Sequence, residues 1–144
     1  MGHGRKDPSS KGQDKKGEDL DFEISFYESI LKKVPGFVQV LIALGDLYTK
    51  KGQWQKGLEV DLKLAQMRPD DPMVFYNLAC SYSLLNDTKA ALLALRKAFE
   101  CGYDDFDYLR TDQDLENLLK DTHFQEYLRG LKKKKKTSSK PSHL

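Results

Sequence analysis

Two consecutive windows of the sequence decide the fold: residues 38–71 read VQVLIALGDLYTKKGQWQKGLEVDLKLAQMRPDD, and residues 72–105 read PMVFYNLACSYSLLNDTKAALLALRKAFECGYDD. At an offset of 34 residues Tyr48 falls on Tyr82, and the other apolar positions coincide in the same register. Within each window apolar residues recur twice with the spacing of an amphipathic helix. A fixed period with two helices per repeat is typical of a helical solenoid, in which each helix pair buries its apolar face against the next.

Large and small residues stand at fixed places in both windows. These residues are Leu44, Gly45, Tyr48 and Pro69 in the first window and Leu78, Tyr82 and Ala91 in the second. They match the tetratricopeptide repeat pattern W-x₂-L-G-x₂-Y, then A-x₃-F, then P, and the chain resembles that family over residues 20–131. The resemblance implies an all-α fold, a short α-α superhelix (solenoid) of antiparallel helix pairs.

Three of the departures from the family pattern stand out. Asp61 stands where a buried aromatic residue is usual, and Tyr103 replaces the closing proline. Gly57 stands inside a helix where alanine is usual, at a cost of about 1 kcal/mol. The pattern is almost lost in residues 106–131, as expected of a terminal unit that faces water on one side.

Capping signals predict the helix boundaries. Pro35 and Gly52 end helices, and Asp71-Pro72 is an N-cap acid followed by a proline suited to the first helical position. About seven helices are expected, over residues 20–33, 38–51, 54–67, 72–85, 88–100, 112–120 and 123–131. The predicted domains are a disordered tail at 1–19, a repeat domain at 20–131 with repeats at about 38–71 and 72–105, and a disordered lysine-rich tail at 132–144. Within the repeat domain, a half repeat precedes the two full repeats and a divergent helical cap follows them.

The charge of the chain is unevenly distributed. Residues 132–144 hold six lysines and no acid, whereas residues 20–131 carry 13 basic and 18 acidic residues. A folded part of this kind lacks the basic face of a nucleic-acid-binding domain. No apolar run approaches the ~18–20 residues of a membrane span, and the N-terminus has no apolar signal segment. These features predict a cytoplasmic protein.

The resemblance also implies where a partner binds, because the first helix of each pair lines the concave face of tetratricopeptide folds. The residues expected to face this groove are Gln39, Ile42, Asp46, Met73, Tyr76, Asn77, Cys80 and Leu84. An apolar strip among them is suited to an extended or helical peptide. The alternative is that a terminal helix covers these side chains as ordinary core. The family's carboxylate clamp is not expected, since Ile42 and Asp46 stand where it needs Lys and Asn.

Residues typical of catalysis or metal binding do not come together in the sequence. His3, His123 and His143 lie apart, and none stands four residues from another histidine or from a cysteine. Three aspartates within residues 104–107 lack the glycine and final glutamate of a calcium loop. No phosphate-binding glycine loop or nucleophile elbow occurs. We therefore expect a non-enzymatic protein with no cofactor and no metal.

Two functional hypotheses follow. The preferred one is an adaptor, or scaffold, for protein–protein interaction that binds a peptide or protein segment in the groove. In the alternative, the helical body is a spacer or self-assembly unit, and the lysine-rich tail binds a polyanion, either nucleic acid or anionic lipid. The tail residues concerned are Lys132, Lys133, Lys134, Lys135 and Lys136. Self-association through an exposed apolar end is a further possibility, so a homo-oligomer is also considered.

Overall fold

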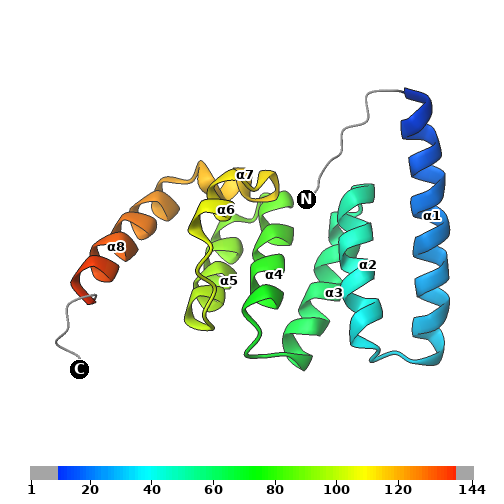
Figure 1. Ribbon diagram of the computed structural model, residues 1–144, viewed down its shortest axis with the longest axis horizontal. Helices are drawn as coiled ribbons and strands as arrows, with labels where there is room; N and C mark the ends of the chain where they lie inside the picture. Colours follow the sequence, from blue (N-terminus) through cyan, green and yellow to red (C-terminus); the bar gives the residue numbers. More distant parts are fainter. Residues whose placement is uncertain (1–9, 139–144) are drawn as a thin grey trace. The chain divides into compact units, whose positions relative to one another are not determined.

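The computed structural model describes residues 10–138, and for residues 10–16, 132 and 134–138 it describes the backbone alone. All the regular elements in this range are helices, which confirms the predicted all-α class (Figure 1). The chain divides into two compact units, Met1–Pro69 and Asp70–Leu144. This division falls close to the junction of the two sequence windows, so each unit contains one repeat.

The first unit contains α1 (Ser10–Lys33), α2 (Val38–Lys51) and α3 (Trp54–Met67). Helices α2 and α3 form an antiparallel pair, and α1 packs against α2 (Figure 1). The predicted bounds of α2 and α3 are confirmed, because Gly52 adopts the left-handed conformation (φ 84°) that ends α2. One buried apolar cluster of this unit consists of Ile24, Val40, Leu44, Leu47 and Tyr48.

Helix α1 begins ten residues before its expected start at Leu20, within the segment expected to be a disordered tail. Polar contacts beside the apolar seam also join α1 to α2. The Tyr48 hydroxyl donates a hydrogen bond to the Glu28 carboxylate (2.5 Å), and the Lys51 ammonium lies 2.6 Å from the Asp21 carboxylate. Lys51 also donates to the carbonyl of Gly17, upstream of the expected start. Apolar periodicity alone cannot predict this extension, because its contact with α2 is polar.

Small residues bring α2 and α3 close together. A Cβ added to Gly45 would lie 3.2 Å from a carboxylate oxygen of Asp61, and one added to Gly57 would lie at ordinary contact distance from Tyr48 and Thr49. Asp61 is buried at the position where the family has an aromatic residue. The absence of a side chain on Gly45 leaves room for this carboxylate.

The second unit begins with an antiparallel pair, α4 (Pro72–Leu84) and α5 (Thr88–Glu100). Both helices have aspartate N-caps. The Asp71 carboxylate accepts hydrogen bonds from the amides of Met73 and Val74, and the Asp87 carboxylate accepts one from the amide of Ala90. These bonds satisfy amides that have no partner within the first helical turn, so the helix starts are set locally.

The rest of the second unit differs from the expectation. It contains α6 (Phe106–Thr111), a 3₁₀ turn η1 (Gln113–Leu115), α7 (Glu116–Leu119) and α8 (Thr122–Ser138). The expected helix at 112–120 is thus a 3₁₀ turn followed by a short α-helix, α6 was not expected, and residues 10–138 hold eight α-helices rather than about seven. The caps are Asp105, Asp112 and Asp121, which accept bonds from the amides of Tyr108, Asp114 and Phe124.

Apolar side chains from the C-terminal segment are buried in the second unit. Leu109, Leu115, Leu118 and Phe124 are fully buried, and η1 and α7 pack against α4. Helix α8 continues past the expected end at residue 131 into the lysine run. The cap therefore shares a core with α4 and α5, although its sequence has almost lost the repeat pattern.

Candidate functional site

Helices α2 and α4 are the first helices of their repeats, and each carries residues that were predicted to line a groove. On α2, Gln39, Ile42 and Asp46 are all exposed, and Ile42 is 47% exposed. Their spacing of three and four residues puts them on one side of the helix. Asp46 also forms an ion pair with Lys50 at 3.0 Å, one turn further on. The α2 face therefore combines one apolar side chain with polar groups at its two ends.

On α4 the corresponding face is largely covered. Tyr76 is 2% exposed, Cys80 is buried, and Leu84 is half-buried, whereas Met73 and Asn77 remain exposed. The prediction that Tyr76 and Cys80 are available to a partner is therefore wrong. The C-terminal cap covers them, which was the alternative left open by the sequence.

A polar network holds the cap against α4. The Tyr76 hydroxyl donates to the Asp112 carboxylate at 2.5 Å, and the Cys80 thiol lies 3.8 Å from the same oxygen. The rings of Tyr76 and Tyr103 stack with their centroids 4.5 Å apart. Burial raises the pKa of Tyr76 well above its ordinary value, and the Cys80 thiol and the bond to Asp112 raise it further. At neutral pH the phenol is therefore a hydrogen-bond donor and a structural group.

Further along α4, Ser83 makes a second contact with the cap. Its backbone carbonyl accepts a bond from the Asn117 side chain at 2.9 Å, and its hydroxyl accepts one from the amide of Leu118 at 3.2 Å. Ser83 is fully buried. Ser83 and Asp112 were missed by the sequence analysis, because a serine or an aspartate gives no periodic signal. For Ser83, the one feature of the sequence that could have indicated this contact is the presence of small polar residues on the otherwise apolar helix α4.

The remaining predicted sites lie apart from these faces. Lys133 is exposed on α8, while the side chains of Lys132, Lys134, Lys135 and Lys136 lie outside the described part of the structure. His123 lies 3.8 Å from the Asp121 carboxylate and is exposed, and His3 and His143 lie outside the described residues. In residues 10–138, where side chains are described, no three His, Cys, Asp or Glu side chains gather in an arrangement able to hold a metal ion. Within that same part, no helix has the length and apolar character to cross a membrane.

The sequence comparisons give two relatives from Arabidopsis thaliana. The first, a protein whose name marks it as chloroplastic, is 36% identical over 85 residues, which cover 57% of this chain and 25% of that protein. The second, Protein CTR9 homolog, is 38% identical over 72 residues, covering 50% of this chain and 6% of that protein. This chain thus spans a quarter or less of the length of the curated relatives it matches. No family model matches it.

Solved structures of MamA have a similar fold. A crystal structure of MamA superposes with a TM-score of 0.56 at 26% identity, over 68% of this chain and 56% of that chain. MamA 41-end from Desulfovibrio magneticus RS-1 superposes with a TM-score of 0.59 at 19% identity, over 78% of this chain and 68% of that chain. These similarities confirm the predicted fold class, a tetratricopeptide-like arrangement of helix pairs. They support a repeat protein of this general type without assigning one specific family.

Proposed function

We propose that this protein is a non-enzymatic adaptor whose first unit binds a segment of a partner protein along the open face of α2. The observation that carries the proposal is the exposure of Gln39, Ile42 and Asp46 on one side of that helix. The equivalent face of α4 is largely covered by the chain's own cap. In tetratricopeptide folds the first helix of each pair lines the concave binding face. The exposed face of α2 is therefore the best candidate for a partner-binding surface.

The chemistry of the α2 face indicates the kind of segment it fits. Ile42 provides an apolar anchor, and the Gln39 amide can both donate and accept hydrogen bonds. The Asp46 carboxylate favours a basic or hydrogen-bond-donating group, although Lys50 competes for it. A short helical or extended peptide with an apolar side chain next to a basic one meets these requirements.

Peptide selection followed by mapping tests the proposal. A displayed random peptide library is selected on the full chain, and a selected peptide is titrated into ¹⁵N-labelled protein. We expect shifts to concentrate at Gln39, Ile42 and Asp46, and Ile42→Ser to weaken binding about tenfold, since a buried aliphatic anchor contributes roughly 1.5–3 kcal/mol. The matched control is Leu93→Ser, which removes a similarly exposed aliphatic side chain from α5.

Two results would contradict the proposal. In the first, the affinity of Ile42→Ser for the selected peptide equals that of the wild type. In the second, replacing Lys132–Lys136 with glutamine abolishes binding, and affinity falls steeply with salt, which is the behaviour expected of the lysine-tail alternative.

The cytoplasmic location stays a prediction. One relative is named as chloroplastic, so imaging of the tagged full chain in its own cell is the measurement that assigns the compartment.

A further inference from the structure

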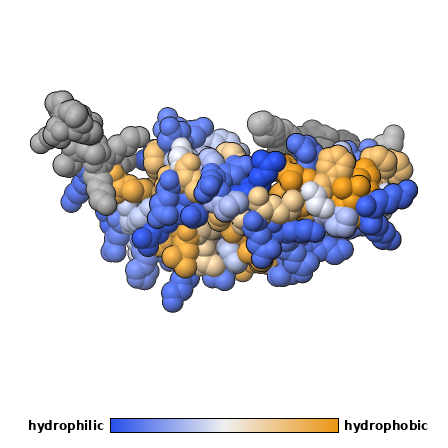
Figure 2. Space-filling view, turned by 90° about the horizontal axis from the view of Figure 1, so that it is seen from below, coloured by the Kyte–Doolittle hydropathy of each residue, from blue (hydrophilic) through white to orange (hydrophobic). Residues whose placement is uncertain are grey.

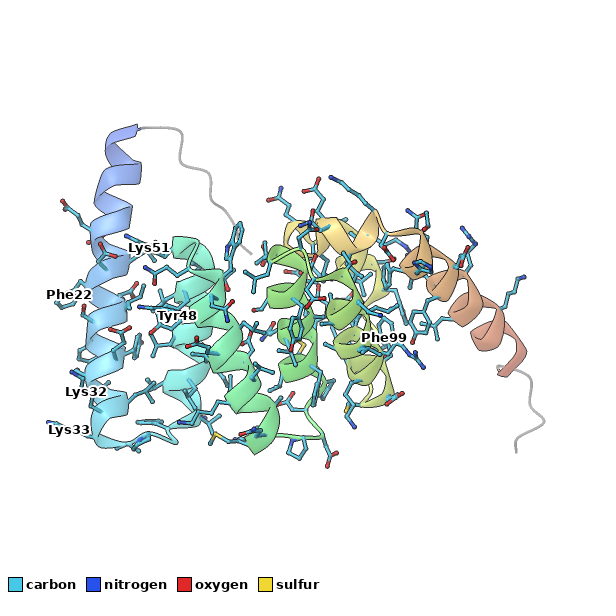
Figure 3. The ribbon with its side chains drawn as sticks, turned by 180° about the vertical axis from the view of Figure 1, so that it is seen from behind. Phe22, Lys32, Lys33, Tyr48, Lys51 and Phe99 are labelled. Carbon is cyan, nitrogen blue, oxygen red and sulfur yellow. The ribbon has the colours of Figure 1, made fainter. Side chains whose placement is uncertain are left out.

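Helix α1 has one face buried against α2 and an opposite face that carries aromatic side chains. The inward residues are Leu20, Ile24, Tyr27, Glu28 and Leu31, which pack on α2 or hydrogen-bond to it. Phe22 and Phe26 lie on the other side of the helix and are 73% and 53% exposed. Figure 3 shows Phe22 on the side of α1 away from α2. Two exposed phenylalanines one turn apart form an apolar patch on this helix. Figure 2 shows one face of the molecule, where hydrophobic patches interrupt a largely hydrophilic surface.

The exposed face has a definite order of chemistry along its length. Asp19, Phe22, Phe26, Ser29 and Lys33 follow one another at steps of three and four residues, and all five are exposed. This spacing keeps them on one stripe of an α-helix, about 21 Å long at 1.5 Å per residue. The stripe has an acid at one end, two aromatic rings, a small residue, and a base at the other end. We call it the α1 stripe.

A stripe with this order is complementary to itself when two copies run antiparallel. If a two-fold axis passes through Phe26, Asp19 of each copy lies opposite Lys33 of the other. The two Phe26 rings then meet at the axis, and each Phe22 lies opposite position 30, one residue from the small side chain of Ser29. A parallel arrangement places Asp19 against Asp19 and Lys33 against Lys33, so like charges repel. The charge pattern thus selects one orientation.

We propose that the α1 stripe is the contact through which a second copy of this chain binds, forming an antiparallel, two-fold symmetric α1–α1 dimer. A two-fold contact uses the same patch on both copies, which a self-complementary stripe satisfies. The contact is one helix face and falls below the roughly 800 Å² per partner of a standard interface, so the dimer is weak, with a dissociation constant on the order of 10–100 µM. This interface is separate from the α2 face of the proposed function.

Sedimentation velocity of the full chain between 1 and about 1000 µM is the first test, and a reversible monomer–dimer equilibrium is expected. The combined change Phe22→Ser and Phe26→Ser should raise the dissociation constant at least tenfold. Because both rings are exposed, circular dichroism should show that the helix content is kept. Leu93→Ser, which alters a 61% exposed leucine of the second unit, should leave the dimer unchanged.

A charge exchange tests the antiparallel register. Asp19→Lys alone and Lys33→Asp alone each create two like-charge contacts across the axis, so each variant should be more monomeric than the wild type. An equimolar mixture of the two variants should form a heterodimer, because every contact across the axis again joins opposite charges. The double variant carrying both changes should also recover dimerisation.

Three results would overturn the inference. The first is a wild-type chain that stays monomeric at the highest concentration, which would leave the stripe to a different partner. The second is a dimer that survives loss of both phenylalanines. The third is failure of the mixed charge variants to associate, which would exclude the antiparallel register.

Discussion

Ile42 and Tyr76 stand at equivalent positions of the two repeats, yet their environments are opposite. Ile42 of α2 is 47% exposed, whereas Tyr76 of α4 is 2% exposed. Both residues lie on the first helix of an antiparallel helix pair. The difference comes from the segment that follows α5, because its Asp112 bonds to Tyr76 and its Tyr103 stacks on it. A repeat position therefore does not determine by itself whether a side chain is exposed or belongs to the core.

The two helix pairs also differ in how well they are capped and packed. The first pair has Phe37 and Gln53 at its N-caps, without side-chain cap bonds, and the second has Asp71 and Asp87, both bonded. The first pair has Gly57 where the second has Ala91. We infer that the second helix pair is intrinsically the more stable one. Substitutions that exchange equivalent positions can test this comparison.

The largest expected effect is that of Tyr76→Ala. Removing a buried aromatic ring together with its hydrogen bond should lower the free energy of unfolding by about 3–5 kcal/mol. Ile42→Ala, at the equivalent exposed position, should cost less than about 1 kcal/mol. Urea unfolding followed by far-UV circular dichroism measures both values. Similar losses for the two variants would contradict the difference in burial between the two units.

Alkaline pH should weaken the second unit. In the unfolded chain tyrosine loses its proton near pH 10, whereas burial raises the pKa of Tyr103 to about 12 and also raises that of Tyr76. Between these values the unfolded state binds fewer protons than the folded state, so the free energy of unfolding falls as pH rises. Below pH 10 these groups should contribute no pH dependence.

Phenolate absorbance near 295 nm, recorded together with circular dichroism from pH 8 to 12.5, measures this effect. The Tyr76→Phe variant should show a shallower loss of stability above pH 10, because one such group is gone. Ionisation of all seven tyrosines near pH 10 with no loss of helix would contradict the prediction.

An exchange of helix caps should have an intermediate effect. Gln53 (φ −91°, ψ 69°) and Asp87 (φ −97°, ψ 78°) share one backbone conformation, but only Asp87 makes a side-chain cap bond. Asp87→Gln should therefore cost about 1 kcal/mol, and Gln53→Asp should stabilise the chain by up to about that amount. Thermal unfolding of the two variants gives the values. A gain from Asp87→Gln would show that the second pair does not depend on its caps.

The smallest expected effect is that of Gly57→Ala, which gives the first helix pair the residue of the second. The added methyl group meets only ordinary contacts, so the variant should be more stable by about 0.5–1 kcal/mol. Gly52→Ala is the control and should destabilise, since Gly52 has a φ of 84°. Equilibrium unfolding in urea measures both. A loss of stability in Gly57→Ala would mean that the α2–α3 contact is tighter than its geometry indicates.

The helix pairs of the two windows were predictable because their signals are local. Gly52 ends α2 through its own backbone conformation, and Asp71 starts α4 by bonding amides two and three residues ahead. The cap was predicted less well. Asp105 and Asp112 divide residues 106–119 into short helical pieces, and in a stretch with several aspartates the sequence does not show which of them cap helices.

The sequence by itself determined the all-α class, the 34-residue period and the boundaries of α2 and α3. Periodicity and capping act within a few residues, so they can be read along the chain. Only the tertiary structure decided that Tyr76 is buried and Ile42 exposed, and that Phe22 and Phe26 lie opposite the face that α1 buries. These outcomes depend on residues distant in sequence, such as Asp112 for Tyr76, because burial depends on which segments pack together.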